Sequence, residues 1–310
     1  MKLQPVAYIF LGFLSAVAAY FIHAAFKYTR MISGIFLSLV YKPAFENFSS
    51  GLSEKITILD SSDREVEALF VENKGSRKVL IFCHESGAPK ESWEKYAHFI
   101  PGSGFHILSV DLQKPSTALA ENSLSQWPTR EDVERLLTVI RWAKGSLGAD
   151  VKVVLFGVSN GADIALGASF ADPAVVAVVA DGLFSMKEIF RDYIRKWAPI
   201  LVKPSLFGDK HPDWIVNLFT DLGFWYSQKK SGAEFVDVEK LLRKKHVPIL
   251  MIHGGVDDYA PGTHQAFLEK INSDRKSLER FVVPNARHNQ AVVVAKGAYE
   301  EKIINFLEKS

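Results

Sequence analysis

The pentapeptide Gly-Val-Ser-Asn-Gly at residues 157–161 holds a serine whose hydroxyl could act as a nucleophile. It follows an apolar run at 151–156 and precedes an alanine-rich stretch at 162–170, which predicts a strand, a tight turn and a helix. Glycine on both sides of the turn removes side chains that would collide with the neighbouring strand and helix. Ser159 would then stand clear of the sheet at a helix N-terminus, where the backbone N–H of Asn160 can stabilise an oxyanion.

A serine hydroxyl is too weak an acid to attack an acyl carbon unaided, so this chemistry needs a histidine base and an acid that orients it. Asp257 follows an apolar run at 248–253, and His288 follows the next run at 279–284. Because parallel strands all end at one edge of a sheet, we expect both loops to lie beside Ser159. The sequence predicts that Ser159 attacks, His288 transfers the proton and Asp257 holds the imidazole.

Two other carboxyl groups are alternatives for the acid. Asp258 is adjacent to Asp257, and Asp181 ends another apolar run from which it could also reach the histidine. His84 and His253 end expected strands near the site, and we interpret both as structural histidines with satisfied hydrogen bonds.

The elements that must position these residues follow from an alternation of short β-branched runs with longer amphipathic stretches. This alternation is typical of a mostly parallel sheet covered by helices, an α/β fold. The first two strands, at 55–59 and 65–72, are expected to form an antiparallel hairpin. The remaining expected strands are 78–83, 105–110, 151–156, 174–180, 248–253 and 279–284, and the expected helices are 91–100, 130–144, 162–170, 262–271 and 299–309.

The interval at about 183–245 is expected to hold helices and no strand, so we interpret it as a small helical cap inserted into the domain. Aromatic side chains crowd into it. They either pack the insertion onto the domain or form an apolar wall over a binding site. The aromatic residues are Trp197, Trp214, Phe219, Phe224, Trp225 and Tyr226.

The N-terminus contains an uncharged stretch from Val6 to Phe26, which as a helix would span about 30 Å, the thickness of a bilayer core. We therefore expect residues 1–30 to form a transmembrane anchor, residues 31–50 an interfacial linker, and residues 51–310 the main domain. A cleaved signal peptide, cut after the small residues at 16–18, and a buried soluble helix are the alternatives. Because more positive charge follows this stretch than precedes it, the positive-inside rule slightly favours a cytoplasmic main domain.

Composition excludes several other classes of function. The 37 Lys and Arg residues balance 35 Asp and Glu residues, so no nucleic-acid partner is expected. The only cysteine, Cys83, permits neither an internal disulfide nor a multi-cysteine metal site. No pair of histidines has metal-ligand spacing with a carboxylate, and no glycine-rich phosphate loop or dinucleotide fingerprint follows a strand. We expect no cofactor and no metal.

Taken together, these motifs resemble the α/β-hydrolase superfamily over about residues 55 to 309. The segment HGGVDDYAP at 253–261 is similar to the family's acid-bearing loop, and NARHN at 285–289 is similar to its turn into the catalytic histidine. Asn289 and DGLFSMKEIF at 181–190 resemble a membrane-anchored subset. The resemblance, which extends to serine-aminopeptidase-like members, implies an α/β-hydrolase fold with a Ser-His-Asp triad.

The first oxyanion loop departs from the family pattern, because His84-Glu85-Ser86-Gly87 stands where the family usually has His-Gly and small residues. We expect the backbone N–H of Ser86 to join that of Asn160 as an oxyanion donor. If the Glu85 carboxylate faces inward, it would repel the developing negative charge. The alternative is that Glu85 faces solvent.

The sequence thus predicts a serine hydrolase that cleaves an ester or related acyl bond of a small-molecule substrate through an acyl-enzyme intermediate. The membrane anchor and the aromatic insertion favour a substrate with an apolar or lipid-like acyl chain. A serine peptidase of the aminopeptidase or prolyl-oligopeptidase-like type, which shares the triad, is one alternative. A membrane-tethered binding protein on a hydrolase fold is the other.

Overall fold

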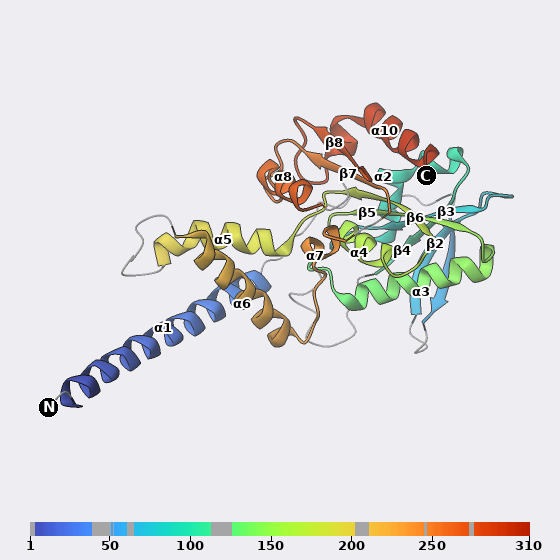
Figure 1. The fold of residues 1–310 in the computed structure, drawn as a ribbon. Helices are drawn as coiled ribbons and strands as arrows, with labels where there is room; N and C mark the ends of the chain where they lie inside the picture. The colour runs from blue at the N-terminus through green and yellow to red at the C-terminus, as the bar shows by residue number, and fades with distance from the viewer. Residues whose placement is uncertain are drawn as a thin grey trace. The chain divides into compact units, whose positions relative to one another are not determined.

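Eight strands form a single, mostly parallel sheet, as the alternation of apolar runs predicts (Figure 1). The computed structural model describes residues 4–38, 51, 53–60, 65–112, 126–201, 211–244, 247–272 and 276–310. The strands are β1 (Glu54–Leu59), β2 (Glu65–Val71), β3 (Lys78–Cys83), β4 (His106–Val110), β5 (Lys152–Val158), β6 (Val175–Asp181), β7 (Ile249–Gly254) and β8 (Leu278–Val283).

The strand order is β1-β2-β4-β3-β5-β6-β7-β8. β2 pairs antiparallel with β1 and with β4, which confirms the expected opening hairpin, and the other neighbouring strands are parallel. Strands β3 to β7 are almost wholly buried, which explains why their sequences are continuous apolar runs and do not alternate.

The chain divides into two compact units. One unit comprises Val40–Met186 and Ala233–Ser310 and contains the sheet, so we call it the sheet unit. The helical unit comprises Met1–Leu39 and Lys187–Gly232.

Helices cover both faces of the sheet, with α3 and α10 on opposite sides (Figure 1). One hydrophobic cluster contains side chains of α3, α4, α7 and α8, and a second contains side chains of α2, α9 and α10. The helices of this unit are α2 (Trp93–Ala97), α3 (Arg130–Leu147), α4 (Asn160–Ser169), α7 (Val238–Leu242), α8 (Gly262–Ile271), α9 (Ala291–Val294) and α10 (Lys296–Glu308).

The helix expected at 91–100 is shorter than its pattern suggests. It consists of the 3-10 turn Lys90–Ser92, the short α2 and a second 3-10 turn at Ile100–Ser103. Pro101 lies in the first turn of that last segment, and Gly104 ends it with a left-handed φ of 84°. Proline and a left-handed glycine stop a helix here, although the apolar spacing would continue it.

The helical unit contains α1 (Gln4–Ser38), α5 (Met186–Leu201) and α6 (Asp213–Ser231). The rings of Phe36 and Phe190 stack with their centroids 3.8 Å apart. The buried hydroxyls of Ser33 and Ser227 share a hydrogen bond of 2.7 Å. These contacts hold the C-terminal half of α1 against α5 and α6.

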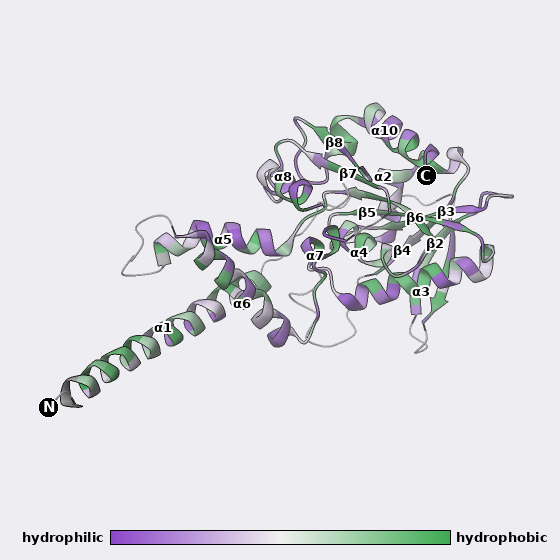
Figure 2. Cartoon of the chain, in the orientation of Figure 1, coloured by the Kyte–Doolittle hydropathy of each residue, from purple (hydrophilic) through white to green (hydrophobic). Residues whose placement is uncertain are grey.

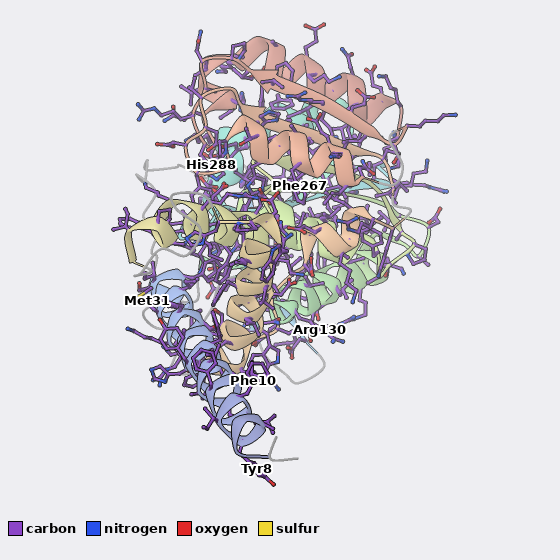
Figure 3. All side chains as sticks on the ribbon, turned by 60° about the vertical axis from the view of Figure 1, so that its left-hand side comes forward. Tyr8, Phe10, Met31, Arg130, Phe267 and His288 are labelled. Atoms are coloured by element: carbon purple, nitrogen blue, oxygen red, sulfur yellow. The ribbon has the colours of Figure 1, made fainter. Side chains whose placement is uncertain are left out.

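The N-terminal half of α1 is apolar and exposed (Figure 2). The side chains of Tyr8 and Phe10 project outward from the helix, while Met31 lies toward its other end (Figure 3). Residues Ala7–Ser38 form the one helix, within the described part of the chain, that is long and apolar enough to cross a membrane by length and composition. α1 also runs unbroken from the segment expected as an anchor into the segment 31–50 expected as a linker, of which residues 39–50 lie outside the described residues.

Two glycines permit the close approach between β5 and α4. A Cβ atom on Gly161 would overlap the backbone carbonyl of Cys83 at the end of β3, and one on Gly157 would overlap the backbone of α4. Because the obstructing atoms are backbone, a rotamer change cannot relieve either overlap.

We expect Gly161→Ala to lower the free energy of unfolding by about 2 kcal/mol or more, because the strand or the helix must shift to admit the methyl group. Gly145→Ala is the matched control. Gly145 lies inside α3 with nothing within 4 Å of an added Cβ, so alanine there should stabilise the protein by about 0.5–1 kcal/mol. Urea unfolding followed by circular dichroism measures both, and equal effects would contradict the steric argument.

Candidate active site

Ser159 lies at the junction between β5 and α4, in a strained backbone conformation. Its φ is 53° and its ψ is −118°, and the only other described residue besides glycine with a positive φ is Asn289. The N–H of Ser159 donates to the carbonyl oxygen of Asp181, at the end of β6, over 2.7 Å. The sharp turn predicted from the pentapeptide is thus present, and the neighbouring strand fixes it.

Ser159, His288 and Asp257 lie in one hydrogen-bonded row. The Ser159 hydroxyl lies 2.9 Å from Nε2 of His288, and Nδ1 of His288 lies 2.7 Å from Oδ2 of Asp257. The three residues follow β5, β8 and β7, whose carboxyl ends meet at one edge of the sheet. All three are at most 8% exposed. The structure therefore brings together the three residues that the sequence singled out.

The environment of Asp257 keeps its carboxylate ionised. Its Oδ1 accepts hydrogen bonds from the backbone N–H groups of Tyr259 at 2.8 Å and Ala260 at 2.9 Å. Although burial alone would raise the pKa of Asp257, the hydrogen bond and charge of His288 and these two N–H groups lower it below its ordinary value. A charged carboxylate on Nδ1 orients the ring so that Nε2 faces the serine.

The two alternative acids occupy other positions. Asp258 is exposed, whereas its neighbour Asp257 is buried. Asp181 is fully buried, but its Oδ2 accepts a hydrogen bond of 2.8 Å from the hydroxyl of Tyr299 on α10. Of the three carboxyls, Asp257 is the one hydrogen-bonded to His288.

The two expected oxyanion donors, Asn160 and Ser86, belong to different elements. Asn160 is the first residue of α4, where N–H groups have no acceptor within the helix, and its side chain donates to the carbonyl oxygen of Gln126 at 2.9 Å. Ser86 is buried in the loop after β3, next to Gly87, which has a left-handed φ of 75°. Asn160 thus begins α4 and Ser86 lies in the loop after β3, both at the carboxyl edge of the sheet, and the role of each as an oxyanion donor stays a prediction.

Glu85 is buried, so the alternative in which it faces solvent is excluded. It is 6% exposed, and its Oε1 accepts a hydrogen bond of 2.9 Å from the hydroxyl of Tyr96 on α2. Its other oxygen, Oε2, is buried and has no hydrogen-bond partner among the described residues. A buried acceptor without a hydrogen bond destabilises the folded state, because it has lost its hydration and gained no donor in return.

Two carboxyl–tyrosine pairs are therefore buried in this part of the sheet unit, Glu85 with Tyr96 and Asp181 with Tyr299. Burial raises the pKa of Asp181 to about 7, and the charges of Glu85 and Asp257 add to this, while Tyr299 and His288 oppose it. The two tyrosines gave no signal in the sequence, because both lie on amphipathic helices where an aromatic residue is ordinary core. The ring of Tyr259, 4.7 Å from that of His288 between centroids, was also missed.

His84 and His253 are both buried, but the expectation of satisfied hydrogen bonds is wrong for His253, whose Nδ1 has no hydrogen-bond partner in the part of the chain that the structure describes. Nδ1 of His84 donates to the carbonyl oxygen of its neighbour Glu85 over 2.8 Å. Burial lowers the pKa of His253 to about 4, so this ring is neutral at pH 7. Among the described residues, no cluster of His, Cys, Asp and Glu side chains has the arrangement of a metal site.

No protein-family model matches the sequence, and no curated protein matches it either. Solved structures do. An esterase from Pyrococcus furiosus superposes with a TM-score of 0.61 at 18% identity, over 87% of this chain and 97% of the esterase.

Two further structures agree with this likeness. A serine hydrolase involved in carbazole degradation has a TM-score of 0.53 at 19% identity, over 83% of this chain and 100% of its own. An esterase from Exiguobacterium antarcticum has a TM-score of 0.54 at 16% identity, over 81% of this chain and 98% of its own. At these identities the likeness is one of fold, and this chain has the α/β-hydrolase fold.

Proposed function

We propose that this protein is a serine hydrolase that cleaves an ester or a related acyl bond of a small-molecule substrate. The observation that carries the proposal is the row of hydrogen bonds from Ser159 through His288 to Asp257, with heavy-atom distances of 2.9 Å and 2.7 Å. Both distances lie within the reach required for proton transfer between a nucleophile, its base and the orienting acid.

In the first half-reaction, Oγ of Ser159 attacks the acyl carbon as Nε2 of His288 removes its proton. The tetrahedral intermediate collapses, and the bond to the leaving group breaks as His288 returns the proton to the leaving oxygen or nitrogen. In the second half-reaction, water attacks the acyl-enzyme with the same proton transfers and releases the acid and Ser159. Asp257 stays ionised and stabilises the imidazolium.

The negative charge that develops on the acyl oxygen needs donors in a fixed position. We assign this role to the backbone N–H groups of Asn160 and Ser86. The N-terminus of α4 supports the assignment, because its partial positive charge lies next to Ser159. The Glu85 carboxylate, in the loop that also contains Ser86, would repel the negative charge that develops on the acyl oxygen.

The apolar N-terminal helix supports a substrate with an acyl chain, because a domain tethered to a membrane surface meets lipid-like esters at high local concentration. A peptidase would use the same three residues. The leaving group is chosen by the pocket around the triad and not by the triad itself. The assignment therefore concerns the acyl half of the substrate.

We expect a fluorophosphonate probe to label the wild-type protein at Ser159 and to leave Ser159→Ala unlabelled, because the probe reacts only with an activated serine. Mass spectrometry of the labelled peptide identifies the site. Ser185→Ala, which alters a buried serine that donates to Glu239 and not to a histidine, is the control and should label normally. If the wild-type protein stays unlabelled under conditions that label a control hydrolase, the proposal fails.

The second prediction concerns the acid. We expect Asp257→Asn to lower kcat by about 10⁴-fold with the fold intact, because a neutral amide can hold the wrong tautomer of His288. Asp181→Asn is the matched control, since it also replaces a buried carboxylate of this site but one that bonds to Tyr299. It should change kcat by less than about 10-fold. A greater loss in Asp181→Asn than in Asp257→Asn would reverse the assignment.

The third prediction concerns Glu85. We expect Glu85→Gln to raise kcat on p-nitrophenyl acetate by about 3- to 10-fold, because it removes a negative charge next to the developing oxyanion. Tyr96→Phe removes the hydrogen bond to Oε1 but keeps the carboxyl group, so it should give no increase. Unchanged or lower turnover in Glu85→Gln would mean that this charge does not act on the transition state.

A further inference from the structure

The helical unit carries a partly open apolar cavity of about 440 Å³, formed entirely by residues of α1, α5, α6 and the segment just before α6. This volume is within the range of sites that hold small molecules. None of the described residues that line it is Asp, Glu, Lys or Arg. The site therefore suits a hydrocarbon group, since a charged group inside it would lose its hydration without an ionic partner.

The shape of the cavity follows α1. Its lining on this helix begins at Tyr20 and continues to Phe36, which at 1.5 Å per residue is about 24 Å along the helix axis. On the other side it is lined by side chains of α5 and α6, including Trp197, Trp214 and Leu218. An apolar site elongated in this way fits an extended chain better than a compact ring.

The cavity is continuous with the part of α1 that could lie in a membrane. The uncharged stretch Val6–Phe26 is long enough to cross a bilayer core, and the cavity lining starts inside this stretch and ends beyond it. If the stretch spans the bilayer, one end of the cavity lies at the depth of the lipid chains and the other lies past the headgroups.

The rim carries positive charge and tryptophan. Lys27 lies 5.7 Å from the ring centroid of Tyr28, and Lys196 lies 5.6 Å from that of Trp197, and both rings line the cavity. Trp214, which also lines it, is 64% exposed. Lysine and tryptophan together are typical of the level of the phosphate headgroups at a membrane surface.

We propose that this cavity binds one acyl chain of a bilayer glycerophospholipid, with the phosphate headgroup held outside near Lys27 and Lys196. The chain leaves the leaflet beside Tyr20 and lies along α1 between α5 and α6. Binding forms and breaks no covalent bond. It requires neither Ser159 nor hydrolysis, because every lining residue belongs to the helical unit.

The test uses the full-length protein in nanodiscs of palmitoyl-oleoyl phosphatidylcholine that contain a few per cent of a phosphatidylcholine with a diazirine in the middle of its sn-2 chain. After irradiation, mass spectrometry maps the residues that carry lipid. We expect adducts on the cavity-lining residues of α5 and α6, such as Tyr193, Trp197, Trp214 and Leu218, as well as on exposed α1. Trp225, exposed on α6 but outside the lining, should stay unmodified.

Ala24→Phe is designed to fill the cavity and should lower the adducts on α5 and α6 by about five-fold or more, because a packed site has no room for both groups. Ala19→Phe is the matched control, since Ala19 is exposed on the same helix and does not line the cavity. It should leave the adducts unchanged. Ala198→Phe fills the cavity from α5 and serves as the second variant if Ala24→Phe does not fold.

Three outcomes would overturn the proposal. The first is lipid adducts confined to the exposed turns of α1 around Tyr8 and Phe10. The second is an unchanged pattern in the folded cavity-filling variants. The third is a cross-link on α5 or α6 to a second copy of the chain in place of lipid. Ser159→Ala should give the wild-type adducts, so a failure of the proposed hydrolase activity would leave this result intact.

Discussion

The strained backbone of Ser159 is the constraint on which the site depends. A residue other than glycine at φ 53° and ψ −118° costs about 1–3 kcal/mol, and it persists only where its surroundings enforce it. Here the enforcement comes from the pairing of β5 with β6, since Val158 is in register with Asp181 and the next N–H, that of Ser159, bonds to the Asp181 carbonyl. Sheet register therefore sets the position of the hydroxyl, and a slip of one residue would turn it away from His288.

Asp181 links this backbone constraint to the electrostatics of the site. Its carbonyl oxygen holds Ser159, while its carboxyl group, buried against Tyr299, has a pKa of about 7. Such a group changes charge in the same pH range as a histidine. The charge of His288 opposes this rise in the pKa of Asp181, whereas the charge of Glu85, on the loop after β3, adds to it. The charge of Asp181 therefore depends on His288, Asp257 and Glu85 together.

The sequence predicts the sheet and the row of three residues well, because both depend on local patterns. A strand buried on both faces must be an apolar run, and loops that follow parallel strands must meet at one edge. The pairs Tyr96–Glu85 and Tyr299–Asp181 could not be predicted in this way. The second of these joins residues 118 positions apart, and the choice of partner arises from the packing of α10 against the sheet.

The extent of α1 has a similar explanation. Lys27 and Arg30 end the uncharged stretch, but charges do not end a helix, and no proline occurs between Pro5 and Pro43. The boundary between anchor and linker at residue 30 rests on a change in polarity. The helix itself continues to Ser38, because its backbone hydrogen bonds do not depend on that change. Polarity decides which solvent a segment prefers, and backbone chemistry decides where its secondary structure stops.

The contact between α1 and α6 includes groups that do not require water to associate, beside the aromatic pair of Phe26 and Tyr226. Ser33 and Ser227 join through hydroxyls, and Gly223 of α6 leaves room for the ring of Phe190 and the side chain of Ile32. Small residues and hydroxyl bonds are also what pairs helices inside lipid, where the hydrophobic effect gives no attraction between them. The contact between Ser33 and Ser227 is therefore of a kind that forms in water and in lipid alike, so it does not by itself require this part of α1 to lie in either one.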